Sequence, residues 1–305
     1  MNKSLLAHFA AATAALSAGT ALVATRYVVG ETDPISLAFY RYFIGAVCFL
    51  PLLFFVWPKH RVSATDFGKI ALLGILAFCL FTLGFNASLE YIPAARGAVG
   101  LATVPIQTLI IAAIFGREVL TFRKVLAVII AFIGIAVVFG PEAMNVTTSN
   151  YFIGDVLMLA GVFCGSLYSV FSRSSIQKHG PMFVTPIAMM FGALALFILM
   201  MINGTVQGFP TFSTKGWIAV IFLGTFAGAI QFGLFTWALK WISPTTAGLY
   251  ITLSPIAAVV LGILLIGESV TLVLVVGLAL VLLAILLGSG ALSQLWGLIR
   301  LPRDK

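Results

Sequence analysis

The chain has few charged residues. Only 9% of its 305 residues are Asp, Glu, Lys or Arg, whereas a soluble globular domain carries about 25%. Apolar residues make up 61%, which excludes a soluble globular protein. The 17 basic and 9 acidic residues leave a net charge of +8, but they form no basic run on a polar surface of the kind that binds nucleic acid. We therefore expect the lipid bilayer as the surroundings and no nucleic-acid partner.

Motifs for catalysis and for metal binding are missing as well. The three cysteines all fall inside apolar runs, which favours packing over disulfides; they are Cys48, Cys79 and Cys164. His8, His60 and His179 stand at the ends of such runs without clustered ligands, so we expect no metal and no cofactor. No Asp, Glu or Lys lies in the middle of an apolar run, where ion-coupled pumps and intramembrane enzymes usually have one. A central proton relay is therefore disfavoured.

Long apolar runs are what the sequence does contain. A helix needs about 20 apolar residues to cross the hydrocarbon core, and no run alternates with the period of two that a barrel strand shows. We predict an all-α integral membrane protein with ten transmembrane helices, at residues 5–29, 35–57, 67–89, 93–115, 122–140, 152–174, 181–203, 215–239, 245–266 and 271–289. The first run also resembles a secretory signal peptide, but its apolar stretch is longer than usual, so we expect it to be retained.

The distribution of basic residues predicts the orientation. With the N-terminus in the cytoplasm, thirteen of the seventeen Lys and Arg residues fall on the inner side. The other four fall at outer span ends; they are Arg26, Arg41, Arg96 and Lys215. This asymmetry follows the positive-inside rule, and it predicts that both termini are cytoplasmic.

The chain matches itself at a fixed offset. A shift of 150 residues pairs Gly74 with Gly224, Pro105 with Pro255, Glu118 with Glu268 and Gly140 with Gly290. Nearer the N-terminus, a shift of 147 pairs Arg26 with Arg173, Pro34 with Pro181 and Gly45 with Gly192. We predict two five-helix repeats, residues 1–146 and 147–292, and a cytoplasmic tail at 293–305. Because five is odd, the second repeat must be inverted, which suits a central site exposed alternately to the two faces.

Polar residues inside the spans are the candidates for that site. Pro105 and Pro255 break equivalent helices near the membrane midplane, and we expect them to be hinges. The predicted substrate-binding residues are polar or aromatic side chains on inward faces, namely Gln107, Gln231, Tyr250, Trp237, Tyr168, Thr103, Ser254 and Asn86. Any single Ser or Thr among them could instead bond to its own helix. Arg96, Glu90 and Arg41 either pair or snorkel near the outer surface, or they form an outer vestibule for a charged substrate group.

Two segments carry a resemblance to a known family. Residues 101–105 continue through Phe115-Gly116-Arg117-Glu118-Val119-Leu120-Thr121, and residues 251–255 continue through Ile266-Gly267-Glu268-Ser269-Val270-Thr271. In these segments and in its ten spans the chain resembles the drug/metabolite transporter superfamily, specifically its EamA-type exporters, and among them the bacterial aromatic amino-acid exporters. The resemblance implies the bacterial inner membrane and a central cavity lined by the third, fourth, eighth and ninth helices, with help from the first and sixth. It also implies that the fifth and tenth helices are peripheral, and that Glu118 and Glu268 favour a helix dipole.

The function that we predict is transport rather than catalysis. The chain is expected to be a secondary transporter that exports amino acids, aromatic or other bulky neutral ones, or related small metabolites by alternating access. The substrate would be neutral or zwitterionic with an apolar body, because the inferred cavity is neutral and rich in aromatic residues. We expect a monomer. The alternatives are a lipid flippase, or a membrane-embedded enzyme that uses the same bundle.

Overall fold

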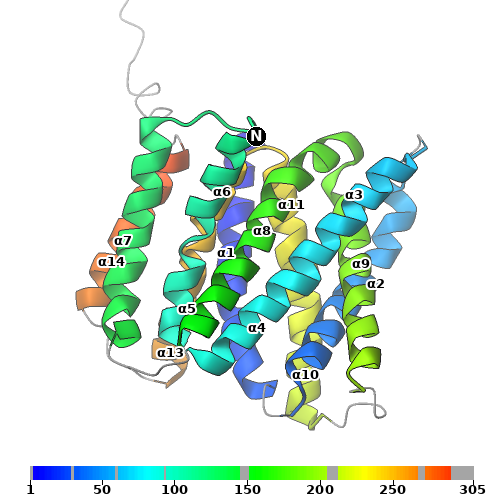
Figure 1. The fold of residues 1–305 in the computed structure, drawn as a ribbon, viewed down its shortest axis with the longest axis horizontal. Helices are drawn as coiled ribbons and strands as arrows, with labels where there is room; N and C mark the ends of the chain where they lie inside the picture. The colour runs from blue at the N-terminus through cyan, green and yellow to red at the C-terminus, as the bar shows by residue number, and fades with distance from the viewer. Residues whose placement is uncertain are drawn as a thin grey trace, which may run out of the picture.

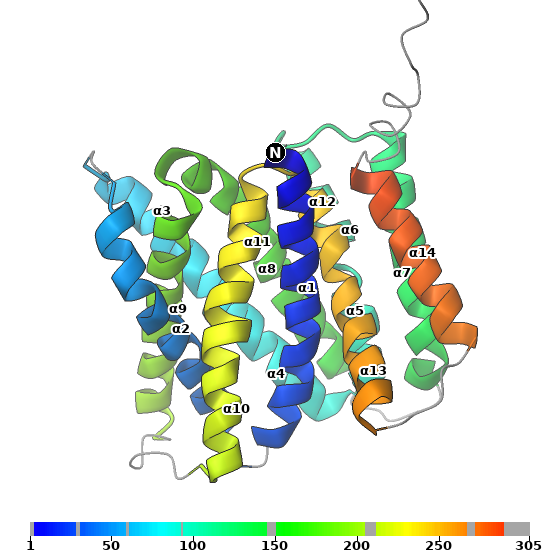
Figure 2. The same ribbon diagram turned by 180° about the vertical axis from the view of Figure 1, so that it is seen from behind.

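The protein folds as a bundle of helices (Figures 1 and 2). The computed structural model describes residues 3–28, 31–58, 61–92, 94–144, 151–204, 212–266 and 272–289. All regular structure in these ranges is helical, which confirms the predicted all-α class. The elements are α1 (Lys3–Val28), α2 (Pro34–Val56), α3 (Ala64–Gly74), η1 (Ile75–Leu80), α4 (Phe81–Tyr91), α5 (Ala94–Leu101), α6 (Val104–Ile114), α7 (Phe122–Met144), α8 (Tyr151–His179), α9 (Pro181–Ile202), α10 (Thr214–Gly224), η2 (Thr225–Ile230), α11 (Gln231–Leu239), α12 (Pro244–Ile251), α13 (Leu253–Ile266) and α14 (Leu272–Ser289).

The helices have the length and composition of membrane spans. In the described residues, eight helical segments are long and apolar enough to cross a bilayer, and a shorter apolar helix covers Val275–Ser289. Large apolar side chains cover the outside of the bundle, and Phe54 and Phe55 are each 86% exposed. Such a surface is stable against acyl chains and not against water. The protein is therefore a multi-pass membrane protein.

Two pairs of helices occupy opposite edges of the bundle. α7 packs along α14 at one edge, and α2 packs along α9 toward the other (Figures 1 and 2). The crossing of α7 and α14 is close because Gly134 and Gly277 face each other. A Cβ on Gly134 would lie 3.0 Å from the Gly277 carbonyl oxygen, and a Cβ on Gly277 would lie 2.8 Å from the Gly134 carbonyl oxygen. The peripheral place that the resemblance implied for the fifth and tenth helices is the place that α7 and α14 take.

The remaining helices form two packed groups. The α8 group consists of residues 64–114 and 151–179, in which α8 packs against α3, α4, α5 and α6. The α1 group consists of residues 3–28 and 214–266, in which α1 packs against α10, α11, α12 and α13. The two groups touch where α6 and α8 meet α11 and α12, at the end of the bundle that carries the N-terminus (Figure 2). In the described part of the chain, no closely packed pair joins α5 to α13 at the other end.

Both prolines chosen as hinges lie where a helix is broken. α5 ends at Leu101 and α6 begins at Val104, so Pro105 occupies the first turn of α6, where its missing N–H costs nothing. α12 ends at Ile251 and α13 begins at Leu253, two residues before Pro255. The fourth and the ninth predicted spans therefore each consist of two helices. Whether these breaks bend during function stays a prediction.

Two π-helical segments interrupt equivalent helices. η1 covers Ile75–Leu80 and η2 covers Thr225–Ile230, and the two ranges differ by the same 150 residues that relate the repeats in the sequence. π-Helical turns are rare, and they are frequent at functional sites. The Arg41 guanidinium donates a 3.0 Å hydrogen bond to the Ala227 carbonyl inside η2, so a polar side chain of α2 supports this irregular backbone within the membrane.

Glycines allow the neighbouring helices to approach these segments. A Cβ on Gly192 of α9 would lie 2.8 Å from the Gly74 carbonyl oxygen, and a Cβ on Gly45 of α2 would lie 3.1 Å from the Gly224 carbonyl oxygen. A Cβ on Gly74 would overlap with the Ala188 backbone. These contacts relate the two halves of the chain in the registers found in the sequence, and they show that the glycines serve packing.

We expect Gly74→Ala to destabilise the protein by about 1–3 kcal/mol, because the new methyl group must displace the backbone of α9. The matched control is Gly68→Ala on the same helix, where a Cβ meets nothing within 4 Å. That variant should gain about 0.5–1 kcal/mol from helix propensity. Thermal unfolding of the purified proteins in detergent measures both. Equal melting temperatures for the two variants would show that the α3–α9 contact is not tight.

Candidate functional site

A cluster of aromatic rings lies in the interior of the bundle. Phe78 of η1 contacts Tyr42, Phe232 and Tyr168, with ring centroids 5.1, 4.8 and 5.8 Å apart. Each contact is edge-on, the arrangement that ring quadrupoles favour. The rings come from α2, η1, α8 and α11, so the cluster joins the α8 group to the α1 group. Phe78, Tyr42 and Tyr168 are each at most 2% exposed.

Tyr168 is a predicted site residue, and its hydroxyl has an unusual environment. The side chain is buried in the aromatic cluster, and the hydroxyl has no hydrogen-bond partner. Tyr42, in the same cluster, bonds to the hydroxyl of Thr82 at 3.0 Å. Burying a hydroxyl without a hydrogen-bond partner costs free energy. Tyr42 has such a partner and Tyr168 in the same cluster has none, so the unpaired hydroxyl of Tyr168 needs a functional explanation.

Gln107 and Thr103 are brought together on α6, as their spacing predicts. The Gln107 amide nitrogen lies 3.3 Å from the Thr103 hydroxyl and 3.4 Å from the Leu159 carbonyl oxygen of α8. The Gln107 Oε1 atom is buried without a partner. Thr103 also donates to the Gly100 carbonyl at 2.6 Å, so its hydroxyl is engaged by its own helix. Gln107 thus keeps one free acceptor inside the α8 group.

Gln231 and Trp237 lie on α11, immediately after η2. The Gln231 Oε1 atom is buried and has no hydrogen-bond partner, which repeats the situation of Gln107 in the other group. Trp237 is partly buried and lies 6.4 Å from Trp241, centroid to centroid. Among the described contacts, no hydrogen bond joins Gln231 to Gln107, so the two amides face separate surroundings.

Tyr250 and Ser254 are placed on the equivalent helix of the other half. The Tyr250 hydroxyl lies 3.2 Å from His8 Nδ1 of α1, so it already has a partner. The histidine was expected at a span end, and this contact on α12 was not anticipated. Ser254 donates to the Ile251 carbonyl at 2.8 Å, which is the alternative of a bond to its own helix.

The two half-helices of the fourth and ninth predicted spans meet at Pro105. A Cβ on Gly248 of α12 would lie 3.3 Å from the Pro105 Cα atom of α6. The absence of a side chain at Gly248 therefore lets the two backbones touch. Pro255 is buried within α13.

Two of the three residues chosen for an outer vestibule, Arg41 and Glu90, have described side chains. Arg41 is tied to η2 through Ala227, and its Nε atom is buried without a partner. Glu90 is exposed near the end of α4, and no ion pair of the described residues joins it to Arg41. The side chain of Arg96 lies outside the described part. Asn86, proposed for the substrate, instead lies 3.5 Å from the Pro34 carbonyl oxygen at the start of α2.

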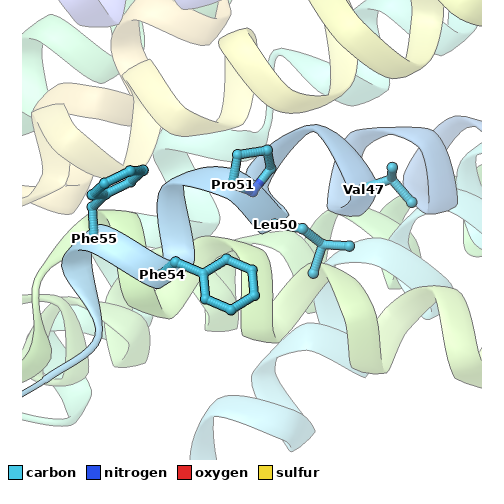
Figure 3. Close-up of a pocket in the computed structure, with 5 residues that line it drawn as sticks. All are labelled: Val47, Leu50, Pro51, Phe54 and Phe55. Atoms are coloured by element: carbon cyan, nitrogen blue, oxygen red, sulfur yellow. The ribbon is translucent and has the colours of Figure 1, made fainter.

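Two apolar pockets lie along α2 rather than at the aromatic cluster. One, of about 540 Å³, is lined by Val47, Leu50, Pro51, Phe54 and Phe55 (Figure 3). The other, of about 570 Å³, lies between α2, α9, η2 and α11 and includes Cys48, Phe49 and Thr225. Neither contains a residue predicted for substrate binding. Their open, apolar walls are typical of a surface that acyl chains cover.

Sequence analysis missed most of this arrangement. Phe78, Phe232 and Tyr42 are ordinary aromatic residues in apolar runs, and the repeat register places Gly228 opposite Phe78, so no signal marked them. The described residues contain no group of three His, Cys, Asp or Glu that could hold a metal ion. Aromatic rings and unpaired polar atoms are groups of the kind that bind a small molecule with an apolar body.

Replacing Tyr168 by Phe should leave stability unchanged or raise it by up to about 1 kcal/mol, because the hydroxyl that is removed has no partner. Tyr42→Phe is the matched comparison, and it should cost about 0.5–1.5 kcal/mol through the lost bond to Thr82. Melting temperatures of the two purified variants in detergent measure both changes in stability. A clear loss for Tyr168→Phe would mean that its hydroxyl serves the fold and is not kept free for a ligand.

Comparison with known proteins identifies the fold and the family. A solved crystal structure shares 18% identity with this chain, covers 95% of it and 98% of its own length, and superposes with a TM-score of 0.79. This likeness shows a shared fold alone.

Curated relatives cover most of the chain. An uncharacterised transporter of Archaeoglobus fulgidus is 29% identical over 269 residues, which is 88% of this chain and 92% of the relative. One from Clostridium kluyveri is 27% identical over 261 residues, 83% of each chain. The uncharacterised inner membrane transporter YedA of Escherichia coli is 27% identical over 282 residues, 88% of this chain and 86% of its own. The sequence profile of the EamA-like transporter family matches residues 5–140 and again 152–290. With nearly its whole length matched in two copies of one profile, the chain belongs to the EamA-like transporter family.

Proposed function

We propose that this protein is a secondary transporter that exports amino acids, aromatic or other bulky neutral ones, or related small metabolites, by alternating access. Its family indicates membrane transport of small molecules, and its relatives are named as transporters. The substrate class and the alternating-access mechanism go beyond what the family and the relatives indicate. The site is assigned to the interior of the bundle, around Tyr168, Gln107 and Gln231.

One observation carries the substrate class. Among the buried polar atoms that have no hydrogen-bond partner, three belong to predicted substrate-binding residues: Tyr168 Oη, Gln107 Oε1 and Gln231 Oε1. Tyr168 belongs to the aromatic cluster of Phe78, and its helix, α8, packs against α6, which carries Gln107, and against α11, which carries Gln231. Buried amide oxygens are acceptors, and a substrate ammonium group can satisfy them, while the phenol can donate to a carboxylate. The rings match an apolar or aromatic body.

The transport cycle rests on ten crossings in two inverted halves, residues 1–146 and 147–292, with a tail at 293–305. The paired π segments and the paired glycine contacts, both in the repeat register, support the duplication. Inversion is supported by two polar links at helix ends. The repeat registers pair α3 with α10 and α8 with α1, so each link is the counterpart of the other. Asp66 at the start of α3 binds Lys178 at the end of α8, while Glu31, beyond the end of α1, binds Ser213 at the start of α10.

Alternating access is supported by the way the two groups touch. α6 and α12 pack closely at the end that carries the N-terminus, while no closely packed pair joins α5 to α13 in the described residues. This asymmetry is that of a transporter closed on one side. We place the protein in a bacterial inner membrane, as the family resemblance implies. With both termini in the cytoplasm, as the basic residues predict, the closed side is the cytoplasmic one. A single chain holds every residue of the site, so we propose a monomer.

The purified protein in proteoliposomes should transport bulky neutral amino acids with saturable kinetics, because they combine an apolar body with the groups that the buried amides and phenol would bind. The measurement is uptake of radiolabelled aromatic, aliphatic, polar and charged amino acids, with and without a pH gradient. Flux of no amino acid would overturn the substrate class. Translocation of phospholipid without flux of a soluble substrate would favour a flippase.

The site residues are tested by matched pairs on the same helices. Gln107→Ala and Gln231→Ala should change the substrate range or the rate while the protein still inserts. Their controls are Ile110→Ala and Ile230→Ala, at neighbouring positions about half exposed to lipid. Tyr250→Ala and Trp237→Ala complete the set. Unaltered transport in Gln107→Ala, Gln231→Ala, Tyr250→Ala and Trp237→Ala would remove the site from these residues.

A further inference from the structure

Glu118 occupies a defined place in the connection between α6 and α7. Gly116 adopts a φ of +60°, a conformation that ends a helix and that a residue with a side chain rarely adopts. The Arg117 and Glu118 amides then both donate to the Ala112 carbonyl, at 2.7 and 3.1 Å. The chain therefore turns tightly at the end of α6, and the position of the Glu118 backbone is fixed relative to that helix.

The Glu118 carboxylate binds a helix of the other half of the chain. Its Oε1 atom accepts a 2.9 Å hydrogen bond from the Thr245 amide, in the first turn of α12. Its Oε2 atom lies 2.6 Å from Lys124 Nζ, near the start of α7. Its side chain is only 2% exposed. The resemblance implied that Glu118 favours a helix dipole. In the structure its carboxylate lies at the N-terminus of α12, about 130 residues further along the chain, rather than at the N-terminus of the helix that follows it.

The carboxylate completes the N-terminus of α12. The first amides of a helix lack partners within the helix, and a negative charge near them is favourable. Ser243 caps α12 and accepts from the Thr246 amide at 3.3 Å, while Glu118 accepts from Thr245. Two of the free amides at this end are thus satisfied, one from within the α1 group and one from outside it.

The contact between Glu118 and Thr245 spans the two packed groups. Glu118 is anchored to the end of α6, which belongs to the α8 group, and Thr245 belongs to the α1 group. Of the other polar contacts near this end of the bundle, one joins the Thr246 hydroxyl of α12 to the Gly288 carbonyl of α14, outside both groups, and two stay inside one group. Asp66 and Lys178 link α3 to α8, at 2.6 Å, and His8 and Tyr250 link α1 to α12. Separation of the groups here would break the Glu118 contact and keep the others.

We infer that Glu118 is the positioning residue that locks the N-terminal side of the transporter, by capping α12 while α6 and α12 are packed together. The inference rests on the proposed alternating access. Opening of this side breaks the bond to Thr245, and the carboxylate then stays paired with Lys124 in its own half. Lys124 therefore keeps the buried charge compensated in both states, and the bond to Thr245 forms only when the side is closed.

The test uses a thiol at the lock itself. The background replaces Cys48, Cys79 and Cys164 by Ala, and Thr245→Cys then supplies a single thiol. Thr245 is fully buried and its hydroxyl has no partner, so the near-isosteric change keeps the backbone amide that Glu118 binds. A membrane-impermeant maleimide is added from each side in turn, to inside-out and right-side-out vesicles.

Glu118→Ala should raise the rate of labelling from the N-terminal side about tenfold, the change expected from loss of one hydrogen bond to a charged group. Glu118→Gln should raise it less, because the amide oxygen can still accept from Thr245. If Glu118→Ala does not yield folded protein, the Glu118→Gln result decides. A labelling rate equal to the parent's overturns the lock.

The control is Asp66→Asn, which weakens a charged contact near the same end but within one group. It should leave labelling of Thr245→Cys unchanged, and an equal increase would show general loosening instead of a specific lock. The assay needs no substrate, so it separates the two proposals. Flux without an effect of Glu118→Ala removes the lock alone, whereas the labelling effect without flux of any substrate removes the proposed function and keeps the lock.

Discussion

Within a bilayer, each backbone amide and carbonyl must find its partner inside the protein, and the rest of this structure depends on that constraint. Regular helices satisfy it automatically. Every irregular point therefore needs a specific solution. Arg41 reaches the carbonyl of Ala227 inside η2, Pro105 lacks an amide where the first turn of α6 would leave one free, and Glu118 takes the Thr245 amide at the start of α12. Arg41 and Glu118 are thus polar side chains that bind backbone groups where helices are interrupted or begin.

The same interruptions connect the fold to transport. α5–α6 and α12–α13 each consist of two helices instead of one continuous helix, and the proposed hinges lie at these interruptions. In this structure α6 and α12 are in contact while α5 and α13 are not closely packed in the described residues. The edge pairs, α2 with α9 and α7 with α14, join the first half of the chain to the second, and α7 also packs against both α6 and α12. They provide a frame around the two groups.

The sequence predicted what depends on local pattern, and it missed what depends on distant contacts. Apolar runs located the helices, the prolines located the helix breaks, and the register of 150 residues matches the positions of η1 and η2. Thr103 and Gln107, both predicted to lie on inward faces, contact each other. No pattern could indicate that Tyr250 meets His8, or that Glu118 caps a helix far along the chain, because those pairs depend on how helices of different halves pack. The candidate site is therefore a prediction refined by geometry.

The π segments have a consequence for the register of the two halves. Such a segment accommodates one extra residue in a helix, and each residue turns the following side chains by about 100° around the axis. An insertion in one copy alone would have put the two halves out of register from that point on. Here Gly74 and Gly140 both keep the same offset to their counterparts, one before η1 and the other well after it. The two parts of the chain that match the same family profile therefore both contain the extra residue, and their register is the same on either side of it.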